Sequence, residues 1–171
     1  MARRSDRNFE KREKRIESLE RKYYDACALR LTVCQKEIRN SEEQGFIGMT
    51  SFLGLGECIS HIIIDAKDKE DAERQIQPFV RLIYEQQRKN CLELVTAERV
   101  TEEILSIFDI IGKNVIDVAD AHHLAIALSH KCVRFITTDR DLYGLTEEKQ
   151  QELKEKFGIP NFSVEKRELD D

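Results

Sequence analysis

Four acidic residues spread along the chain have the types and surroundings of a shared catalytic centre: Asp25, Glu57, Asp120 and Asp139. Asp25 lies late in a predicted short strand, Asp139 follows another predicted strand, and Asp120 lies near the start of the helix before that second strand. Ligands of open parallel sheets bind outside the carboxyl ends of the strands. We therefore expect these three aspartates to converge at one edge of the sheet.

Glu57 is the fourth candidate because its surroundings are unusual for a surface glutamate. It lies within an apolar helical stretch, FLGLGECISHIII at residues 52–64, where burying an unpaired carboxylate would be costly. Gly54 lies on the same helical face, although a glycine inside a helix costs about 1 kcal/mol relative to alanine. We interpret the missing side chain as room for a cation or a phosphate beside Glu57.

Carboxylates that cluster repel one another, so the cluster must either bind protons, which raises its pKa values, or bind metal. Metal is the expectation for a cluster of four. Oxygen ligands suit hard cations such as Mg²⁺ or Mn²⁺, which commonly hold substrate phosphates through the same ion. This donor set is typical of enzymes that cleave phosphodiester bonds.

Alternating strands and helices must position these residues. Short apolar or β-branched runs predict strands, and longer amphipathic or alanine-rich runs predict helices. The predicted strands span residues 22–29, 46–49, 91–95, 133–137 and 162–164, with 46–49 alternatively a turn. One predicted helix follows the first strand and ends near residue 40. The other predicted helices span residues 52–64, 72–89, 100–111, 117–129 and 146–157. The alternation predicts an α/β fold with three α/β/α layers around a mainly parallel sheet.

Length and composition fit a single globular domain with a short extension. The chain has 171 residues, of which 40% are apolar and 36% charged. Its apolar stretches are far shorter than the roughly 20 residues of a membrane span, and no apolar signal segment follows the first arginines, so we expect a cytoplasmic protein. The five cysteines include no CxxC pair, which argues against a disulfide framework and a zinc site.

A basic segment precedes the predicted domain. Residues 1–22 hold nine Lys and Arg against five Asp and Glu, in a chain whose net charge is -5. We expect a basic helical extension at residues 1–21 and the functional domain at residues 22–171. The extension is either a solvated segment without a partner or an arm that contacts nucleic-acid phosphates or a partner subunit.

Four segments resemble, in order and spacing, the motifs of the PIN-domain nucleases: KYYDACAL, GMTSFLGLGE, DVADAHHLAIAL and FITTDRDL. The resemblance covers about residues 22–165, and its most specific part is the pair DAHHLAIAL and FITTDRDL. It implies a PIN-like fold and a metal-dependent endoribonuclease that uses one or two Mg²⁺ or Mn²⁺ ions. The chain departs from the family pattern after the first acid, where Ala26 and Cys27 stand in place of a small polar residue.

The resemblance also implies a role for each acid. Asp25, Asp120 and Asp139 would hold the principal metal, and Glu57 would orient water or help hold a second ion. Auxiliary candidates are Asp117, Asp141 and a hydroxyl from Thr137 or Thr138. Asp117 could instead only stabilise a helix N-terminus, and Asp141 could be only a turn residue. This chemistry needs no imidazole, so we expect no catalytic role for His122 or His123.

Two phosphatase classes that also use parallel sheets do not fit the chain. Phosphatases with an aspartate nucleophile carry a second Asp two residues later, where this chain has Cys27. Cysteine phosphatases need Cys, five residues and Arg, whereas Cys27 and Cys34 are followed at that distance by Val33 and Asn40. A non-enzymatic alternative remains, a catalytically weak PIN-like scaffold that binds RNA or protein.

RNA is the expected substrate, and two biological roles are open. The protein could be a toxin neutralised by an antitoxin-like protein partner, or an RNA-processing nuclease. The N-terminal extension and the long charged helix at residues 72–89 favour processing slightly. We also expect a homodimer, because small domains of this kind tend to self-associate.

Overall fold

A computed structural model describes residues 18–96 and 100–168. Within these residues, five strands form one sheet, and each strand pairs with its neighbours in parallel, in the order β3-β2-β1-β4-β5. The strands are β1 (Glu20–Tyr24), β2 (Phe46–Ser51), β3 (Leu92–Val95), β4 (Arg134–Thr137) and β5 (Ser163–Lys166). The helices are α2 (Ala26–Leu29), α3 (Thr32–Arg39), α4 (Ser41–Gln44), α5 (Phe52–Asp65), α6 (Lys69–Arg88), α7 (Thr101–Ile111), α8 (Val118–Ser129), α9 (Arg140–Tyr143) and α10 (Glu147–Phe157).

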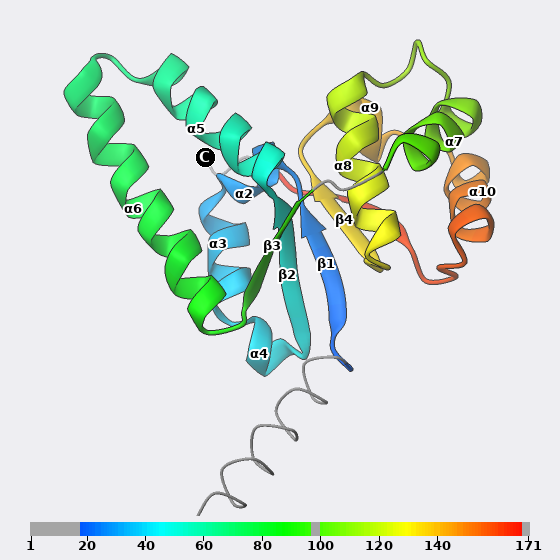
Figure 1. Ribbon diagram of the computed structural model, residues 1–171, viewed down its shortest axis with the longest axis horizontal. Helices are drawn as coiled ribbons and strands as arrows, with labels where there is room; N and C mark the ends of the chain where they lie inside the picture. Colours follow the sequence, from blue (N-terminus) through cyan, green and yellow to red (C-terminus); the bar gives the residue numbers. More distant parts are fainter. Residues whose placement is uncertain (1–17, 97–99, 169–171) are drawn as a thin grey trace, which may run out of the picture.

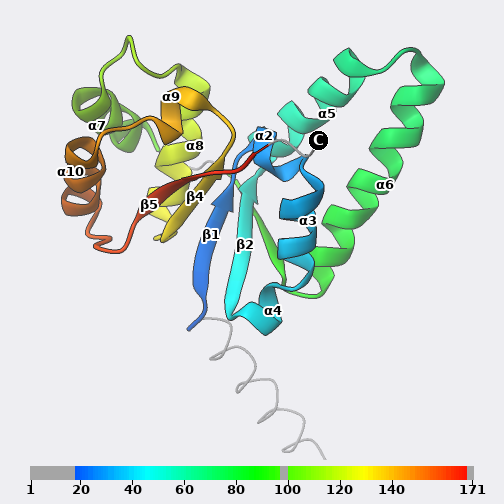
Figure 2. The same cartoon turned by 180° about the vertical axis from the view of Figure 1, so that it is seen from behind.

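Helices cover both faces of the sheet, which confirms the predicted three-layer α/β/α architecture (Figure 1). Successive side chains of a strand point to opposite faces. Tyr23 accordingly packs in the hydrophobic cluster under α7, α8 and α10, while Tyr24 packs in the cluster under α2, α3, α5 and α6. The view from behind shows β5 at the sheet edge next to β4 (Figure 2). Both tyrosines are 0% exposed, so β1 is buried on both faces of the sheet at this point.

The first strand is shorter than predicted. The segment at residues 22–29 was expected to be one strand, but β1 ends at Tyr24 and the next residues form the one-turn helix α2. The Asp25 side chain caps this helix by accepting a hydrogen bond from the Ala28 backbone N–H at 2.8 Å. A short apolar run cannot be assigned to a strand or a helix by periodicity alone, and a capping aspartate favours the helix.

Capping residues mark several helix starts that the sequence predicted. Ser51 caps α5 by accepting from the Gly54 N–H, and Thr146 caps α10 by accepting from the Lys149 N–H. Helix α6 begins at Lys69, three residues earlier than predicted, because Asp68 caps it. Asp141, considered above as only a turn residue, lies in the first turn of α9, which begins at Arg140.

The predicted extension at residues 1–21 lies mostly outside the described residues. β1 begins at Glu20, so the last two residues of that predicted extension belong to the sheet. None of the helices within the described ranges combines the length and apolarity that a membrane crossing requires.

Candidate active site

Asp25 and Asp139 lie together at the carboxyl ends of two adjacent strands. β1 and β4 pair with Tyr24 opposite Ile136, and the Asp25 N–H extends this pairing by donating to the Ile136 carbonyl at 3.1 Å. Asp139 follows β4, and its N–H donates to the Thr137 hydroxyl oxygen at 2.9 Å. Parallel strands end at the same edge of a sheet, so the register of β1 and β4 brings the two aspartates to one place.

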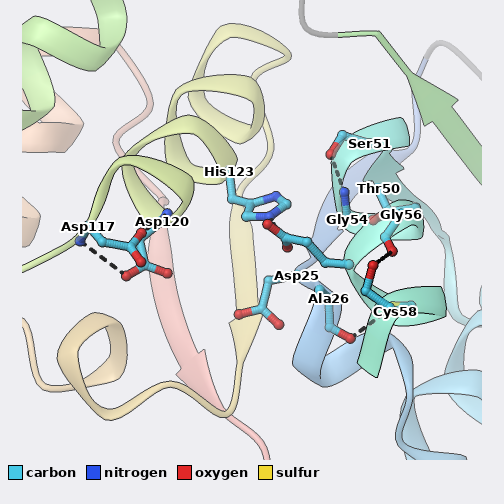
Figure 3. A network of polar contacts seen from close by, with 12 residues as sticks. Asp25, Ala26, Thr50, Ser51, Gly54, Gly56, Cys58, Asp117, Asp120 and His123 are labelled. Atoms are coloured by element: carbon cyan, nitrogen blue, oxygen red, sulfur yellow. Dashed lines mark hydrogen bonds and ion pairs between the residues drawn. The ribbon is translucent and has the colours of Figure 1, made fainter. Parts of the chain in front are cut away.

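Asp120 enters the site from the first turn of α8. The Asp120 N–H donates to the Asp117 carboxylate at 2.9 Å, and the Asp117 N–H donates back to the Asp120 carboxylate at 3.4 Å, which together form a capping box. Figure 3 shows Asp25 between α8, which carries Asp120 and His123, and α5. The capping box fixes the start of α8 and thereby the position of Asp120.

Electrostatics show that the three aspartates share one environment. Burial is the largest cause that raises the pKa of Asp25, which is 5% exposed, and the charge of Asp139 raises it further. Hydrogen bonds from the Ala28 N–H and the Thr137 hydroxyl offset part of this effect. The pKa of Asp120 is raised to about 6 by burial, then by the charges of Asp117 and Asp139. Carboxylates in this situation are relieved by a proton or by a cation.

Glu57 is held by a histidine. The His123 Nε2 atom lies 2.8 Å from a Glu57 carboxylate oxygen, and the Nδ1 atom of the same ring lies 2.7 Å from the Tyr23 hydroxyl. The space beside Gly54, interpreted above as room for a cation or a phosphate, is filled by this ring. A side chain at Gly54 would place its Cβ only 3.3 Å from the His123 Cε1 atom. That interpretation of the glycine is therefore wrong.

Sequence reasoning gave no role to His123, which is 3% exposed and links α8 to β1 and α5. Its partners lie 100 and 66 residues away in the sequence. One signal was present, because His123 follows Asp120 by three residues and so lies on the same helical face.

The auxiliary candidates separate into residues inside and outside the site. Thr137 is fully buried and contacts both Asp25 and the Asp139 backbone. The Thr138 hydroxyl instead contacts the Cys27 thiol, and the exposed Asp141 takes part through its backbone N–H, which donates to the Asp139 carboxylate at 2.7 Å. Asp117 has the helix-capping role that was considered for it.

The acids fit a divalent cation by their chemistry, although they do not form a closed set of ligands. In the parts of the chain that the structure describes, no three His, Cys, Asp or Glu side chains group closely enough to hold a metal ion. The donors are nevertheless all carboxylates, and burial and mutual repulsion raise the pKa of Asp25 and of Asp120. Such oxygen donors suit Mg²⁺ or Mn²⁺.

Comparison with family models assigns the fold to a family. Residues 30–148 match the model of the PIN domain, which is more than half of the chain. The chain therefore belongs to the PIN domain family, whose members are generally nucleases. The matched region contains Glu57, Asp120 and Asp139 and begins five residues after Asp25. No curated protein matches the chain.

Proposed function

We propose that this protein is a metal-dependent endoribonuclease with its active site at Asp25, Glu57, Asp120 and Asp139. The observation that carries the proposal is the shared environment of three aspartates at the carboxyl ends of β1 and β4. Burial and neighbouring acids raise the pKa of Asp25 and raise that of Asp120 to about 6. Membership of the PIN domain family supports the same chemistry.

The acidic residues would have different roles in the reaction. Asp25, Asp120 and Asp139 would hold one Mg²⁺ or Mn²⁺ ion, and Glu57 would orient the attacking water or help hold a second ion. When bound, the cation would offset phosphate charge and favour deprotonation of water. Thr137 keeps Asp25 oriented through its hydroxyl, and Asp117 keeps Asp120 oriented through the capping box. Water attacks phosphorus directly, so no side chain forms a covalent intermediate.

The test is cleavage of an end-labelled, mixed-sequence single-stranded RNA, with DNA of the same sequence as a comparison. We expect internal cuts in RNA with Mn²⁺, none with EDTA, and a loss of at least about 100-fold for Asp25→Asn. Asp109→Asn, an exposed aspartate on α7, is the matched control and should cut at the wild-type rate. Equal cleavage of DNA would overturn the assignment to RNA, and cutting by Asp25→Asn at the control rate would overturn the site.

The open arrangement of the acids favours a second candidate, a PIN-like scaffold that binds RNA or protein with little cleavage. Within the described residues the acids do not close into a metal-binding group. A scaffold would bind RNA, measured by fluorescence anisotropy, without cutting it when Mn²⁺ is present. Its RNA affinity would also survive alanine at Asp139, even where calorimetry shows that Mn²⁺ binding is lost.

Two roles fit the proposed activity, a toxin with an antitoxin-like protein partner and an RNA-processing enzyme. We favour processing, as the charged helix α6 and the N-terminal extension suggested. A toxin would arrest growth when expressed in a heterologous host, and Asp120→Asn would relieve the arrest. Normal growth with active enzyme would support processing.

A homodimer and a cytoplasmic location complete the proposal. The five cysteines are not joined by disulfides, which fits a reducing compartment. Light scattering of the purified protein would test the dimer, and fractionation of cells that express the chain would test the location.

A further inference from the structure

A continuous chain of hydrogen bonds runs from the start of α5 to the carboxylate of Glu57. The Gly54 N–H donates to the Ser51 hydroxyl at 3.0 Å, and this hydroxyl lies 3.0 Å from the Tyr23 hydroxyl. The Tyr23 hydroxyl lies 2.7 Å from His123 Nδ1, and His123 Nε2 lies 2.8 Å from Glu57. This series of hydrogen bonds thus runs from the middle of the sheet to the proposed active site.

Both proton arrangements of this chain give the same contact at Glu57. If Ser51 donates to Tyr23, then Tyr23 donates to Nδ1, and the ring's only N–H is at Nε2. If Tyr23 donates to Ser51 instead, Nδ1 must donate to Tyr23. Nε2 then also carries a proton, because an ionised Glu57 carboxylate can only accept a hydrogen bond. In either arrangement Nε2–H donates to the Glu57 carboxylate.

The surroundings leave the histidine ring little freedom. His123 is 3% exposed, and Tyr23 is itself fixed by stacking on Phe135 with ring centroids 5.3 Å apart. Gly54 gives the ring its space, because a Cβ there would lie 3.3 Å from His123 Cε1 and 3.0 Å from the Thr50 hydroxyl. Glu57 by contrast has a side chain that is 29% exposed, so the histidine is its rigid neighbour.

We infer that His123 is a positioning residue that holds the Glu57 carboxylate in one orientation at the active site, with Tyr23 and Ser51 holding the imidazole. This inference rests on the proposed function. It adds a role for His123, a residue for which the sequence predicted no catalytic role. A glutamate on an open helix face samples several rotamers, whereas a donor fixed by the sheet restricts it to one. Residues that orient active-site carboxylates in this way typically change metal affinity or activity by 10- to 100-fold when removed.

The contact between His123 and Glu57 can be tested by NMR, without an activity assay. Long-range ¹H–¹⁵N spectra of the metal-free protein should show a His123 Nε2 proton that exchanges slowly with water. Glu57→Ala should make this proton exchange rapidly while leaving the other histidines unchanged. A His123 ring without a proton at Nε2, or one that Glu57→Ala does not affect, overturns the inference.

The role is tested by two replacements that separate hydrogen bonding from packing. His123→Gln keeps an N–H donor near the position of Nε2, whereas His123→Phe keeps a ring without a donor. We expect His123→Phe to lower kcat by about 10- to 100-fold with little change in KM, and His123→Gln to recover part of that loss. A residue that only packs would give the opposite order, and that order would overturn the inference.

A double-mutant cycle shows whether His123 acts through Glu57. In the Glu57→Ala background, His123→Phe should lower kcat by no more than about twofold, because the carboxylate that it orients is absent. Losses that multiply in the double variant would overturn the inference.

Two glycines of α5 provide a matched pair. Gly54→Ala places a methyl group against the His123 ring and should lower kcat, whereas Gly56→Ala meets no atom within 4 Å and should not. Equal rates for the two variants would contradict a fixed ring.

Failure of the proposed function has a different signature. If the wild type cuts no RNA while the protected Nε2 proton is present, the nuclease proposal fails. The positioning role is then measured by Mn²⁺ titration, where His123→Phe should weaken binding by about 10- to 100-fold. Mn²⁺ affinity equal to that of the wild type would in that case overturn the inference.

Discussion

The surroundings of Asp120 disfavour the ionised form of its carboxylate. Burial and the charges of Asp117 and Asp139 raise its pKa to about 6, well above its ordinary value of 3.8. Between these two pH values the folded protein binds more protons than the unfolded chain, so stability falls as the pH rises through this window. The carboxylate is ionised at neutral pH, and a bound cation would remove the cost.

This cost predicts an unusual pH dependence for the metal-free protein. We expect Asp120→Asn to gain stability over the wild type at pH 7.5 and to lose most of that advantage at pH 4, a difference of about 1 kcal/mol after allowance for partial exposure. Urea denaturation in EDTA measures it. Asp109→Asn, a change of an exposed aspartate outside the site, is the matched control. A constant advantage of Asp120→Asn at both pH values would contradict a raised pKa.

Single residues were predicted from the sequence only where their chemistry was local. Asp25 and Asp139 were assigned to the edge of the sheet because each follows or ends a strand pattern, and the structure places them there. His123 was not, since its role depends on Tyr23 and Glu57, which reach it only through the tertiary fold.

Helix α8 positions Asp120 through its capping box, and this separates two roles for Asp117. Asparagine caps a helix as well as aspartate does, whereas alanine costs about 1 kcal/mol. If Asp117 only caps α8, Asp117→Asn should keep both stability and RNA cleavage, while Asp117→Ala should lose about 1 kcal/mol of unfolding free energy. Thermal unfolding and the cleavage assay measure the two effects. A large loss of cleavage in Asp117→Asn would instead make Asp117 part of the metal site.

Secondary structure followed the sequence closely where caps and periodicity agreed. Ser51 and Asp117 mark the starts of α5 and α8, and residues 123–128 of the alanine-rich helix α8 are all buried. The helix α2 was predicted as part of the first strand, because its four residues are too few to show a helical period. Their helical state depends on the cap at Asp25, which the apolar run concealed.

At the scale of the whole molecule, Glu37 of α3 forms ion pairs with two segments of the sheet that are far apart in the sequence. Glu37 accepts from Lys22 of β1 at 2.8 Å and from Arg167, which follows β5, at 3.1 Å. Burial alone would raise the pKa of Glu37, but these two hydrogen bonds outweigh it and lower the pKa below 4.5. The stability that the ionised carboxylate adds is therefore fully present above about pH 4.5 and is lost as the pH falls through the lowered pKa.

Replacing Glu37 should destabilise the fold without touching the chemistry. We expect Glu37→Gln to lower the unfolding free energy at pH 7 by about 1 to 3 kcal/mol, because two partly buried cations lose a charged acceptor. The difference from the wild type should shrink below pH 4. Urea denaturation at both pH values measures it, and an unchanged free energy at pH 7 would show that the ion pairs add nothing. RNA cleavage at a temperature where both proteins are folded should be equal.

The layers of the molecule were predictable, but the details of the site were not. Alternating strands and helices specify a parallel sheet with helices on both faces, and all the described strand pairs are parallel. The gap beside Gly54 was misread because the sequence does not reveal which side chain fills it. Register and side-chain orientation arise from contacts between β1, β4, α5 and α8, which no single segment contains.

We propose that the aspartates gathered at the carboxyl ends of β1 and β4 form a metal-dependent site that cuts RNA. The most direct measurement compares Asp139→Asn with Asp109→Asn, two equally conservative changes inside and outside the site, for cleavage of single-stranded RNA with Mn²⁺. We predict that Asp139→Asn loses at least about 100-fold in rate while Asp109→Asn cuts as the wild type does. Equal rates for the two folded variants would contradict the claim.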